Sequence, residues 1–323
     1  MKLLFIAPIF FDYHKLIKTE LDTHYDTVFF RSEVPYNSGV FYYTLKRLCP
    51  SLATYELNRY NRNLVKLIKN EKIERIFIIR GYGLQEEFFN TIKRQCPNVK
   101  IIHYQWDSIR NNPVGLMISQ YADYNYTFDS TDAQKFTQFK YIPLFYSWDI
   151  NHCSEQSDTY TYKTDLLFVG WYHPLRHKIL DQAQTECKKQ GFTLLRYEYL
   201  PLSAYILNKF TTNNIKYKDV KFRKISLKKY HSLLGQTKAV LDIPSKTQTG
   251  ATMRTIETLS MSRKLISTNP TLQQEIFYNP NNIYIWNSNQ PLQISSFLVT
   301  PFNPDSNRYI KNIRQWLEAL YLI

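Results

Sequence analysis

Short apolar runs alternate with longer segments of helical period along nearly the whole chain of 323 residues. This alternation is typical of βαβ units, in which helices connect neighbouring parallel strands. In the first half, the pattern predicts strands at 2–7, 27–31, 75–80, 99–104, 124–128 and 140–145, and helices at 57–70 and 86–95. We therefore expect this half to fold around a parallel sheet with helices on its faces.

The pattern breaks at a polar stretch without period, residues 149–164, and then begins again. The second half predicts strands at 165–169, 192–197, 238–243, 264–267 and 282–286, helices at 175–190, 252–261 and 291–299, and an amphipathic helix at 306–322. The break is typical of a linker. We therefore expect an α/β chain of two Rossmann-like, doubly wound domains that face a cleft, with domains at 1–150 and 151–304 and a C-terminal helix at 305–323.

The chain is strongly basic, with 41 Lys and Arg against 27 Asp and Glu and a net charge of +14. Such a charge favours nucleic acid, an acidic membrane face or a phosphate-bearing substrate as partner. The basic residues are scattered, and the densest run, at 216–229, is interrupted by Asp219. A solvated basic surface is therefore an equal alternative to a functional patch.

The four cysteines, at positions 49, 96, 153 and 187, are distant in sequence and form no Cys-x-x-Cys pair. This spacing argues against a disulfide framework and against a zinc site. The apolar start at 1–11 lacks a cleavage site, so a buried strand explains it better than a signal peptide. No stretch reaches the ~18–20 apolar residues of a membrane span. We expect a cytoplasmic protein whose charge suits the inner face of the plasma membrane.

The richest local signal lies at 240–259, where a buried strand and a hydroxyl-rich loop lead into a helix that starts near Thr252. Thr is a favourable N-cap residue, and the free N–H groups of a helix start suit a phosphate. Lys246 and Arg254 would add positive charge there, and the Glu257 carboxylate could accept hydrogen bonds from ribose hydroxyls. The alternative is an ordinary capped helix on whose surface Arg254 and Glu257 form a pair at i, i+3.

The stretch 257–267 consists of a Glu, a helix end rich in small residues and an aliphatic strand. It resembles the donor-site segment of GT-B glycosyltransferases. The run 250–257, Gly-Ala-Thr-Met-Arg-Thr-Ile-Glu, is similar to bacterial capsule and lipopolysaccharide transferases and, more distantly, to spore-coat-type glycosyltransferases. The resemblance implies a GT-B fold whose C-terminal helix packs back toward the first domain. It also implies that Glu257 holds the ribose of a nucleotide-sugar.

The strand 165–170, followed by Arg176, resembles the opening strand of the donor domain in the same enzymes, where the Gly turn and a basic residue face the diphosphate. The predicted donor site consists of Gly170, Arg176, Lys246, Thr249, Gly250, Arg254 and Glu257. The chain departs from the family at Thr249, where retaining members often have Glu, and at Ser262, where Gly is usual. The first departure leaves inversion or retention open and keeps a noncatalytic nucleotide- or sugar-binding scaffold as an alternative.

No Asp-x-Asp pair, which would chelate a metal on a nucleotide diphosphate, occurs in the chain. We therefore expect no metal and no other cofactor, with Lys, Arg and helix N-termini neutralising the leaving diphosphate. The motifs of serine hydrolases, zinc proteases and P-loop proteins are also absent. A lone Gly-x-Gly at 81–83, in a chain of eight glycines, argues against an NAD or FAD site.

An inverting transfer needs a general base near the acceptor hydroxyl, and parallel sheets build sites at the carboxyl ends of their strands. Asp12 and His14 follow the first predicted strand, and Asp107 follows Trp106 after a later one. We prefer Asp107 to His14 as the base, and for Asp12 we prefer an ordinary helix N-cap. His103 is more simply explained as a core residue.

Arg80 and Tyr82 end another predicted strand and could contact an acceptor, as could Trp106. A structural turn is the simpler interpretation of the Arg80–Gly83 segment.

The prediction is an enzyme that transfers a sugar from a nucleotide-sugar to a glycan or lipid-linked acceptor in bacterial surface polysaccharide synthesis. The basic surface and the aromatic tail helix would give it peripheral contact with an anionic membrane. The alternative from another class is a nucleic-acid-binding protein, which the charge of +14 and the 26 Tyr support. No nucleic-acid-binding motif is present, so we expect no nucleic-acid partner.

Overall fold

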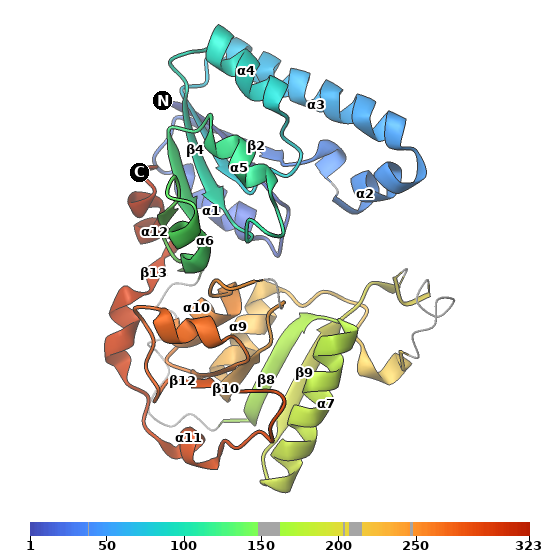
Figure 1. Ribbon diagram of the computed structural model, residues 1–323, viewed down its shortest axis with the longest axis vertical. Coiled ribbons are helices and arrows are strands. Elements are labelled where there is room, and N and C mark those ends of the chain that lie inside the picture. Colours follow the sequence, from blue (N-terminus) through green and yellow to red (C-terminus); the bar gives the residue numbers. More distant parts are fainter. Residues whose placement is uncertain (38, 148–161, 203, 207–214, 246–247) are drawn as a thin grey trace. The chain divides into compact units, whose positions relative to one another are not determined.

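The computed structural model describes residues 1–37, 39–147, 162–202, 204–206, 215–245 and 248–323, and Figure 1 shows its elements. The predicted linker at 149–164 falls almost wholly outside these ranges. The chain forms two compact units. Unit 1 comprises Met1–Ser147, Lys246–Ala251 and Lys311–Ile323, and unit 2 comprises Trp148–Ser245 and Thr252–Ile310. The chain therefore passes from one unit to the other four times.

Unit 1 is built on a six-stranded parallel sheet with the order β2-β1-β3-β4-β5-β6. Its strands are β1 (Lys2–Ala7), β2 (Thr27–Ser32), β3 (Arg75–Ile79), β4 (Lys100–Gln105), β5 (Tyr124–Thr127) and β6 (Lys140–Tyr141). A separate short pair joins β7 (Phe145–Tyr146) to β13 (Lys311–Asn312), also in parallel. The central strands are continuous apolar runs because helices cover both faces of a doubly wound sheet.

The helices of unit 1 are α1 (Tyr13–Leu21), α2 (Gly39–Leu48), α3 (Pro50–Glu71), α4 (Glu86–Gln95), α5 (Val114–Ser119), α6 (Ser130–Lys135) and α12 (Ile313–Ala319), with a 3₁₀ turn η1 (Pro35–Asn37). Side chains alternate between the two faces of a strand. Ile76 and Ile78 pack with residues of α3, α4 and α5 on one face. On the other face, Phe77 contacts Trp316 of α12, so the tail of the chain is part of the core of unit 1.

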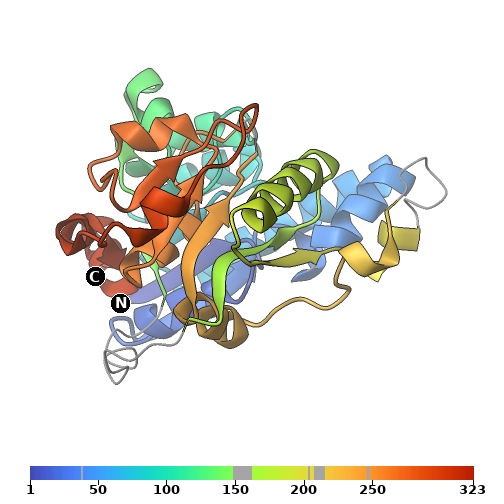
Figure 2. The same ribbon diagram turned by 90° about the horizontal axis from the view of Figure 1, so that it is seen from below.

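Unit 2 contains a five-stranded parallel sheet with the order β12-β11-β10-β8-β9. Its strands are β8 (Thr164–Trp171), β9 (Leu194–Tyr199), β10 (Thr237–Asp242), β11 (Lys264–Ser267) and β12 (Ile283–Ile285). Its helices are α7 (Pro174–Lys189), α9 (Leu227–Gly235), α10 (Met253–Ser260) and α11 (Ser295–Val299), with 3₁₀ turns η3 (Tyr217–Asp219), η4 (Pro270–Gln274) and η5 (Pro304–Tyr309). Phe168 and Leu241 pack with Leu180 of α7 in the core. Figure 2 shows the same elements from below.

Both sheets have the same doubly wound order. Counted from its own first strand, each begins 2-1-3-4-5, and unit 1 adds a sixth strand. The direction of winding changes between β1 and β3 in unit 1 and between β8 and β10 in unit 2. Ligands of such sheets bind beyond the carboxyl ends of the strands at this switch point. The predicted fold class, α/β with two Rossmann-like units, is confirmed.

Helix α3 begins seven residues before the predicted 57–70 and α11 four residues after the predicted start at 291, and two further predicted elements are divided in the structure. The strand predicted at 140–145 is divided into β6 and β7 around Pro143, which has no N–H to donate to a sheet. The helix predicted at 306–322 is instead η5, β13 and α12. Asn312 ends the strand and starts α12 in a capping box with Gln315. In the described part of the chain, no helix combines the length and the apolarity of a bilayer span.

Candidate functional site at the carboxyl ends of the strands

Arg254 of α10 reaches the switch point of unit 2. Its Nε donates to the Val169 carbonyl oxygen at 3.1 Å, and its guanidinium lies over the Phe168 ring, 5.0 Å from the ring centroid. It forms an ion pair with the buried Asp242 at the end of β10. The alternative pair with Glu257 is therefore wrong, because Arg254 points toward the strand ends instead.

Arg176, in the first turn of α7, lies at the same place. Its Nε donates to the Ile243 carbonyl oxygen and its Nη1 to the Trp171 carbonyl oxygen, both at 2.8 Å. Burial and the positive charge of Arg254 lower the pKa of Arg176 to about 10, although Asp242 and Glu198 act in the opposite direction. Two guanidinium groups therefore share this switch point with an incomplete balance of negative charge.

Gly170 makes room for this arrangement. A Cβ at position 170 would lie 3.0 Å from Nη2 of Arg254 and 2.9 Å from the Phe168 ring, so a larger residue would displace the arginine. Thr252 caps α10 as predicted, since its Oγ1 accepts from the Thr255 N–H at 3.1 Å. The Thr252 hydroxyl also donates to Asp242 at 3.0 Å. Asp242 thus fixes the start of α10 beside the two arginines.

Glu257 lies further along α10 and is 1% exposed. Its Oε1 is 3.8 Å from Nε2 of His231 on α9. The neighbouring Tyr230 is also buried, and burial together with the charge of Glu257 raises its pKa. Glu257 is therefore covered by α9 in this structure, and contact between its carboxylate and a ribose requires α9 to move.

Thr249 and Gly250 belong to unit 1 and bind a carboxylate there. The Thr249 hydroxyl donates to Asp129 at 2.6 Å, and the Gly250 N–H donates to the same carboxylate at 2.9 Å. Asp129 is fully buried and also caps α6. The main-chain N–H groups of Thr249 and Gly250, two residues of the predicted donor site, are thus directed at a carboxylate of the protein. Lys246 lies outside the described residues.

Asp107, the preferred base, is half-buried after β4. It accepts hydrogen bonds from the Ser108 N–H at 3.0 Å and from Nδ2 of Asn111 at 3.1 Å. Burial raises the pKa of the nearby Asp132, and the charges of Asp129 and Asp107 act in the same direction. Three carboxylates therefore lie near one another at the ends of β4 and β5.

Asp12 and His14 lie at the start of α1 in different surroundings. Asp12 is the N-cap residue with φ of 63°, but its side chain makes no capping bond and instead pairs with Lys15 at 2.8 Å. His14 is buried against Phe30, with ring centroids 5.0 Å apart. Burial lowers the pKa of His14, so the ring is neutral near pH 7.

The acceptor-side candidates are held by internal contacts. Arg80 forms a salt bridge with the buried Glu33, and the Tyr82 N–H donates to the same carboxylate at 3.1 Å. Trp106 packs with Tyr13 and Phe145, at centroid distances of 5.9 and 5.7 Å.

His103 is fully buried, and its Nδ1 lies 3.2 Å from Oδ1 of Asn125, as expected for a core residue.

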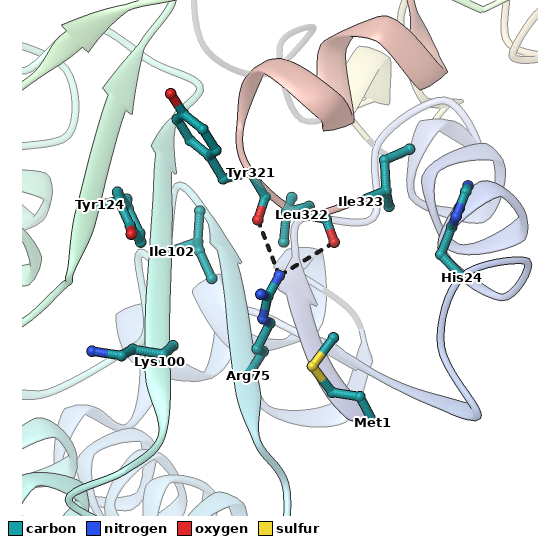
Figure 3. A pocket seen from close by; sticks show the side chains of 9 residues that line it. All are labelled: Met1, His24, Arg75, Lys100, Ile102, Tyr124, Tyr321, Leu322 and Ile323. Atoms are coloured by element: carbon teal, nitrogen blue, oxygen red, sulfur yellow. Dashed lines mark hydrogen bonds between the residues drawn. The ribbon is translucent and has the colours of Figure 1, made fainter.

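A cavity of about 620 Å³ lies at the amino ends of the strands of unit 1, and Figure 3 shows its lining. Arg75, Lys100 and Tyr124, which begin β3, β4 and β5, contribute to it. Nη1 of Arg75 donates to the main-chain oxygens of Tyr321 and Leu322, at 3.0 and 3.5 Å. Because these residues begin their strands, the cavity is separate from the candidates that follow strand ends.

Within unit 2, the structure brings together Gly170, Arg176 and Arg254 of the predicted donor site. Three acidic residues that bind candidate site residues were not predicted from the sequence: Asp242, Asp129 and Glu33. Asp242 ends a buried strand directly before the hydroxyl-rich loop, which is a usable signal. For Asp129 and Glu33 the sequence holds no comparable signal, because their partners are 120 and 47 residues away.

Comparisons with known proteins identify the fold. No protein-family model matches the sequence, and no curated protein matches it. Solved structures do match over nearly the whole chain. The N-terminal domain of a trehalose-6-phosphate phosphatase from Candida albicans has a TM-score of 0.64 at 10% identity, covering 99% of this chain and 95% of that chain. The UDP-GlcNAc 2-epimerase of Neisseria meningitidis bound to UDP-GlcNAc has a TM-score of 0.58 at 8% identity, covering 99% and 98%.

The glycotransferase of kitacinnamycin is also similar, with a TM-score of 0.50 at 10% identity and coverage of 99% and 95%. At these identities the likeness concerns the fold alone. The chain has a GT-B-type fold of two Rossmann-like domains.

Proposed function

We propose that this chain is a metal-independent glycosyltransferase that takes its sugar from a nucleotide-sugar and acts in bacterial surface polysaccharide synthesis. One observation carries the proposal: Arg176 and Arg254 lie together at the switch point of unit 2, where burial and the positive charge of Arg254 lower the pKa of Arg176. A diphosphate would supply the missing negative charge. Structures with this fold include an epimerase bound to UDP-GlcNAc and a glycotransferase, which supports a nucleotide-sugar as ligand.

The remaining roles follow from position and chemistry. Glu257 would hold the ribose once α9 moves away from its carboxylate. The two arginines would stabilise the diphosphate as the bond between it and the sugar breaks. Asp107 would take the proton of the acceptor hydroxyl, whose oxygen forms the new bond to the sugar. We therefore expect Asp107→Asn to lower turnover at least 100-fold and to leave nucleotide affinity unchanged.

A thermal-shift screen against UDP, GDP, CMP, dTDP and their sugar conjugates tests the donor site. Binding to the folded state alone raises the melting temperature by mass action. We expect one nucleotide class to raise it, and Arg176→Gln to lower affinity for that nucleotide about tenfold or more, because one charge-assisted contact is lost. Arg223→Gln, an exposed substitution elsewhere in unit 2, is the matched control.

Retained affinity in Arg176→Gln would contradict the proposed site. A loss of thermal stability in this variant without a loss of affinity would assign Arg176 a purely structural role.

A noncatalytic nucleotide-binding scaffold is the second candidate. It is favoured by the hydrogen bonds of Thr249 and Gly250 to Asp129 and by the burial of Glu257. Chromatography of each donor after incubation with the protein separates the two candidates. A scaffold would bind a nucleotide and leave every donor intact, whereas a transferase would release the nucleoside diphosphate. Formation of an isomeric nucleotide-sugar would instead indicate epimerase chemistry.

A further inference from the structure

Large apolar side chains are exposed on α2 and the first turns of α3. Phe41 is 53% exposed, Leu48 78%, Leu52 45% and Tyr55 57%. The two helices are held together from within by a small separate core that includes Tyr42 and Ala53, so these four side chains are not needed to pack α2 against α3. Figures 1 and 2 show α2 and the first turns of α3 extending beyond the edge of the sheet of unit 1.

Positively charged residues lie further along α3, on the same side of the helix as the exposed apolar residues. Arg59, Arg62, Lys66 and Lys69 follow Leu52 and Tyr55 at intervals of three or four residues, which places all six on one side of the helix. The buried residues Leu64 and Ile68 lie on the opposite side and pack toward the sheet. We name the exposed set the α2–α3 face: Phe41, Leu48, Leu52, Tyr55, Arg59, Arg62, Lys66 and Lys69.

The charge of this face is not balanced locally. Between residues 36 and 70 the sequence has one acidic residue, Glu56, which lies 3.5 Å from Arg59. Among the residues that the structure describes, no carboxylate comes within 4.0 Å of the charged nitrogens of Arg62, Lys66 or Lys69. The face therefore joins an apolar end to a row of cations.

We propose that the α2–α3 face docks unit 1 onto an anionic lipid bilayer. At a bilayer surface, apolar side chains enter between the headgroups while cations contact the lipid phosphates. A polyanion such as RNA would neutralise the cations and leave Leu48 and Leu52 in water. A second copy of the chain would place like charges against each other. The inference concerns attachment, so it goes beyond the proposed function and does not depend on donor chemistry.

Flotation with phosphatidylcholine vesicles, with and without phosphatidylglycerol, tests the docking in the absence of any nucleotide. We expect the full chain to float with the anionic vesicles alone and to dissociate at high salt. The triple variant Arg62→Gln, Lys66→Gln, Lys69→Gln should bind roughly 100-fold more weakly, given the contribution of each cation near such a surface. The double variant Leu48→Gln, Leu52→Gln should bind roughly tenfold more weakly, because two apolar side chains no longer insert.

The matched control is Lys178→Gln, Lys188→Gln, Lys189→Gln on the exposed side of α7, which removes the same charge from unit 2. It should bind nearly as well as the wild type, and all variants should keep their melting temperature because the substituted side chains are exposed. Equal losses in the two triple variants would overturn the proposal in favour of net charge alone. Undiminished binding by the leucine variant would also overturn it, because the cations would then recognise any polyanion, as a parallel titration with duplex RNA would show.

Discussion

Ser262 shows how one side chain can carry a conformational cost at the end of a helix. Its φ of 54° lies in the left-handed region, which glycine adopts without steric penalty. The Ser262 N–H donates to the Leu259 carbonyl at 2.8 Å and the Arg263 N–H to the Thr258 carbonyl at 3.0 Å, so α10 ends in a Schellman-type turn. The glycine that the resemblance led us to expect here would suit this turn better.

We expect Ser262→Gly to raise the free energy of unfolding of unit 2 by about 0.5–1 kcal/mol, because the left-handed conformation disfavours residues with a Cβ. Ser260→Gly, two residues earlier at the last helical position, should lower it by a similar amount. Urea unfolding of both variants measures the two effects. A loss of stability in both would contradict the assigned turn.

His103 makes the stability of unit 1 depend on pH. Burial lowers its pKa to about 4, whereas in an unfolded chain the value is about 6.5. As pH falls, the unfolded state binds the proton first. The stabilisation is therefore complete above about pH 6.5 and decreases toward pH 4. Between pH 7.5 and pH 5, His103 should remove about 2 kcal/mol from the free energy of unfolding.

Denaturant unfolding of the wild type and of His103→Leu at both pH values measures this contribution. The variant loses the contact with Asn125 and should be less stable at pH 7.5, but its further loss on acidification should be smaller by about 2 kcal/mol. The same acid-induced loss in both proteins would mean that His103 is protonated in the folded state.

At the scale of elements, the Asp129 carboxylate anchors the segment 248–251 through Thr249 and Gly250. Asp129→Ala removes the N-cap of α6 and the acceptor of Thr249 and Gly250, and should lower the free energy of unfolding by about 3 kcal/mol. Thr249→Val removes one hydroxyl and should cost about 1 kcal/mol. Hydrogen exchange at the Gly250 amide should accelerate in Asp129→Ala and change less in Thr249→Val. Unchanged exchange in both would show that other contacts hold the segment.

The elements that sequence reasoning located best are buried parallel strands and strongly amphipathic helices. The strand 2–7, the helix 86–95 and the strand 264–267 agree residue by residue with β1, α4 and β11. Continuous apolar runs bounded by polar residues leave few alternatives for such segments. The helices α2 and α9 were missed, because exposed aromatic or apolar residues mix with the buried ones and obscure the period. The helix α1 was anticipated only through the preferred N-cap at Asp12.

The candidate site was predictable where it depends on local sequence. Thr252, Gly170, Arg176 and Arg254 all lie at strand ends or helix starts. The sequence pattern locates these boundaries. The hydrogen bond of Arg254 to the Val169 carbonyl of β8 and the anchoring of Thr249 by Asp129 depend on which segments are neighbours. Strand order is set by packing of the whole sheet, and the sequence pattern does not specify it.

At the scale of the whole molecule, the end of the described chain completes the core of unit 1. Trp316 is fully buried and contacts Phe77, Tyr104 and Phe145, with centroid distances of 6.0, 4.9 and 4.5 Å. The apolar side of the tail helix therefore packs into the core of unit 1, which leaves its Trp316 unavailable for the membrane contact expected of it.

Trp316→Ala should therefore lower the free energy of unfolding of unit 1 by about 3–5 kcal/mol, because it leaves a large cavity in an aromatic core. Calorimetry should show an earlier transition for unit 1 and an unshifted transition for unit 2. Tyr321→Ala, an exposed substitution nearby, is the control. A uniform shift of both transitions would indicate that the units do not unfold separately.

The repeated passage of the chain between units has a consequence for synthesis on the ribosome. The strand pairing and the tryptophan that complete unit 1 come from residues 311–323, and all of unit 2 is made before them. At 5–20 residues per second, the first 147 residues wait roughly ten to thirty seconds for their last partner. During that interval, Phe77 and Tyr104 lack their cover, so the nascent chain presents an aromatic surface that chaperones bind.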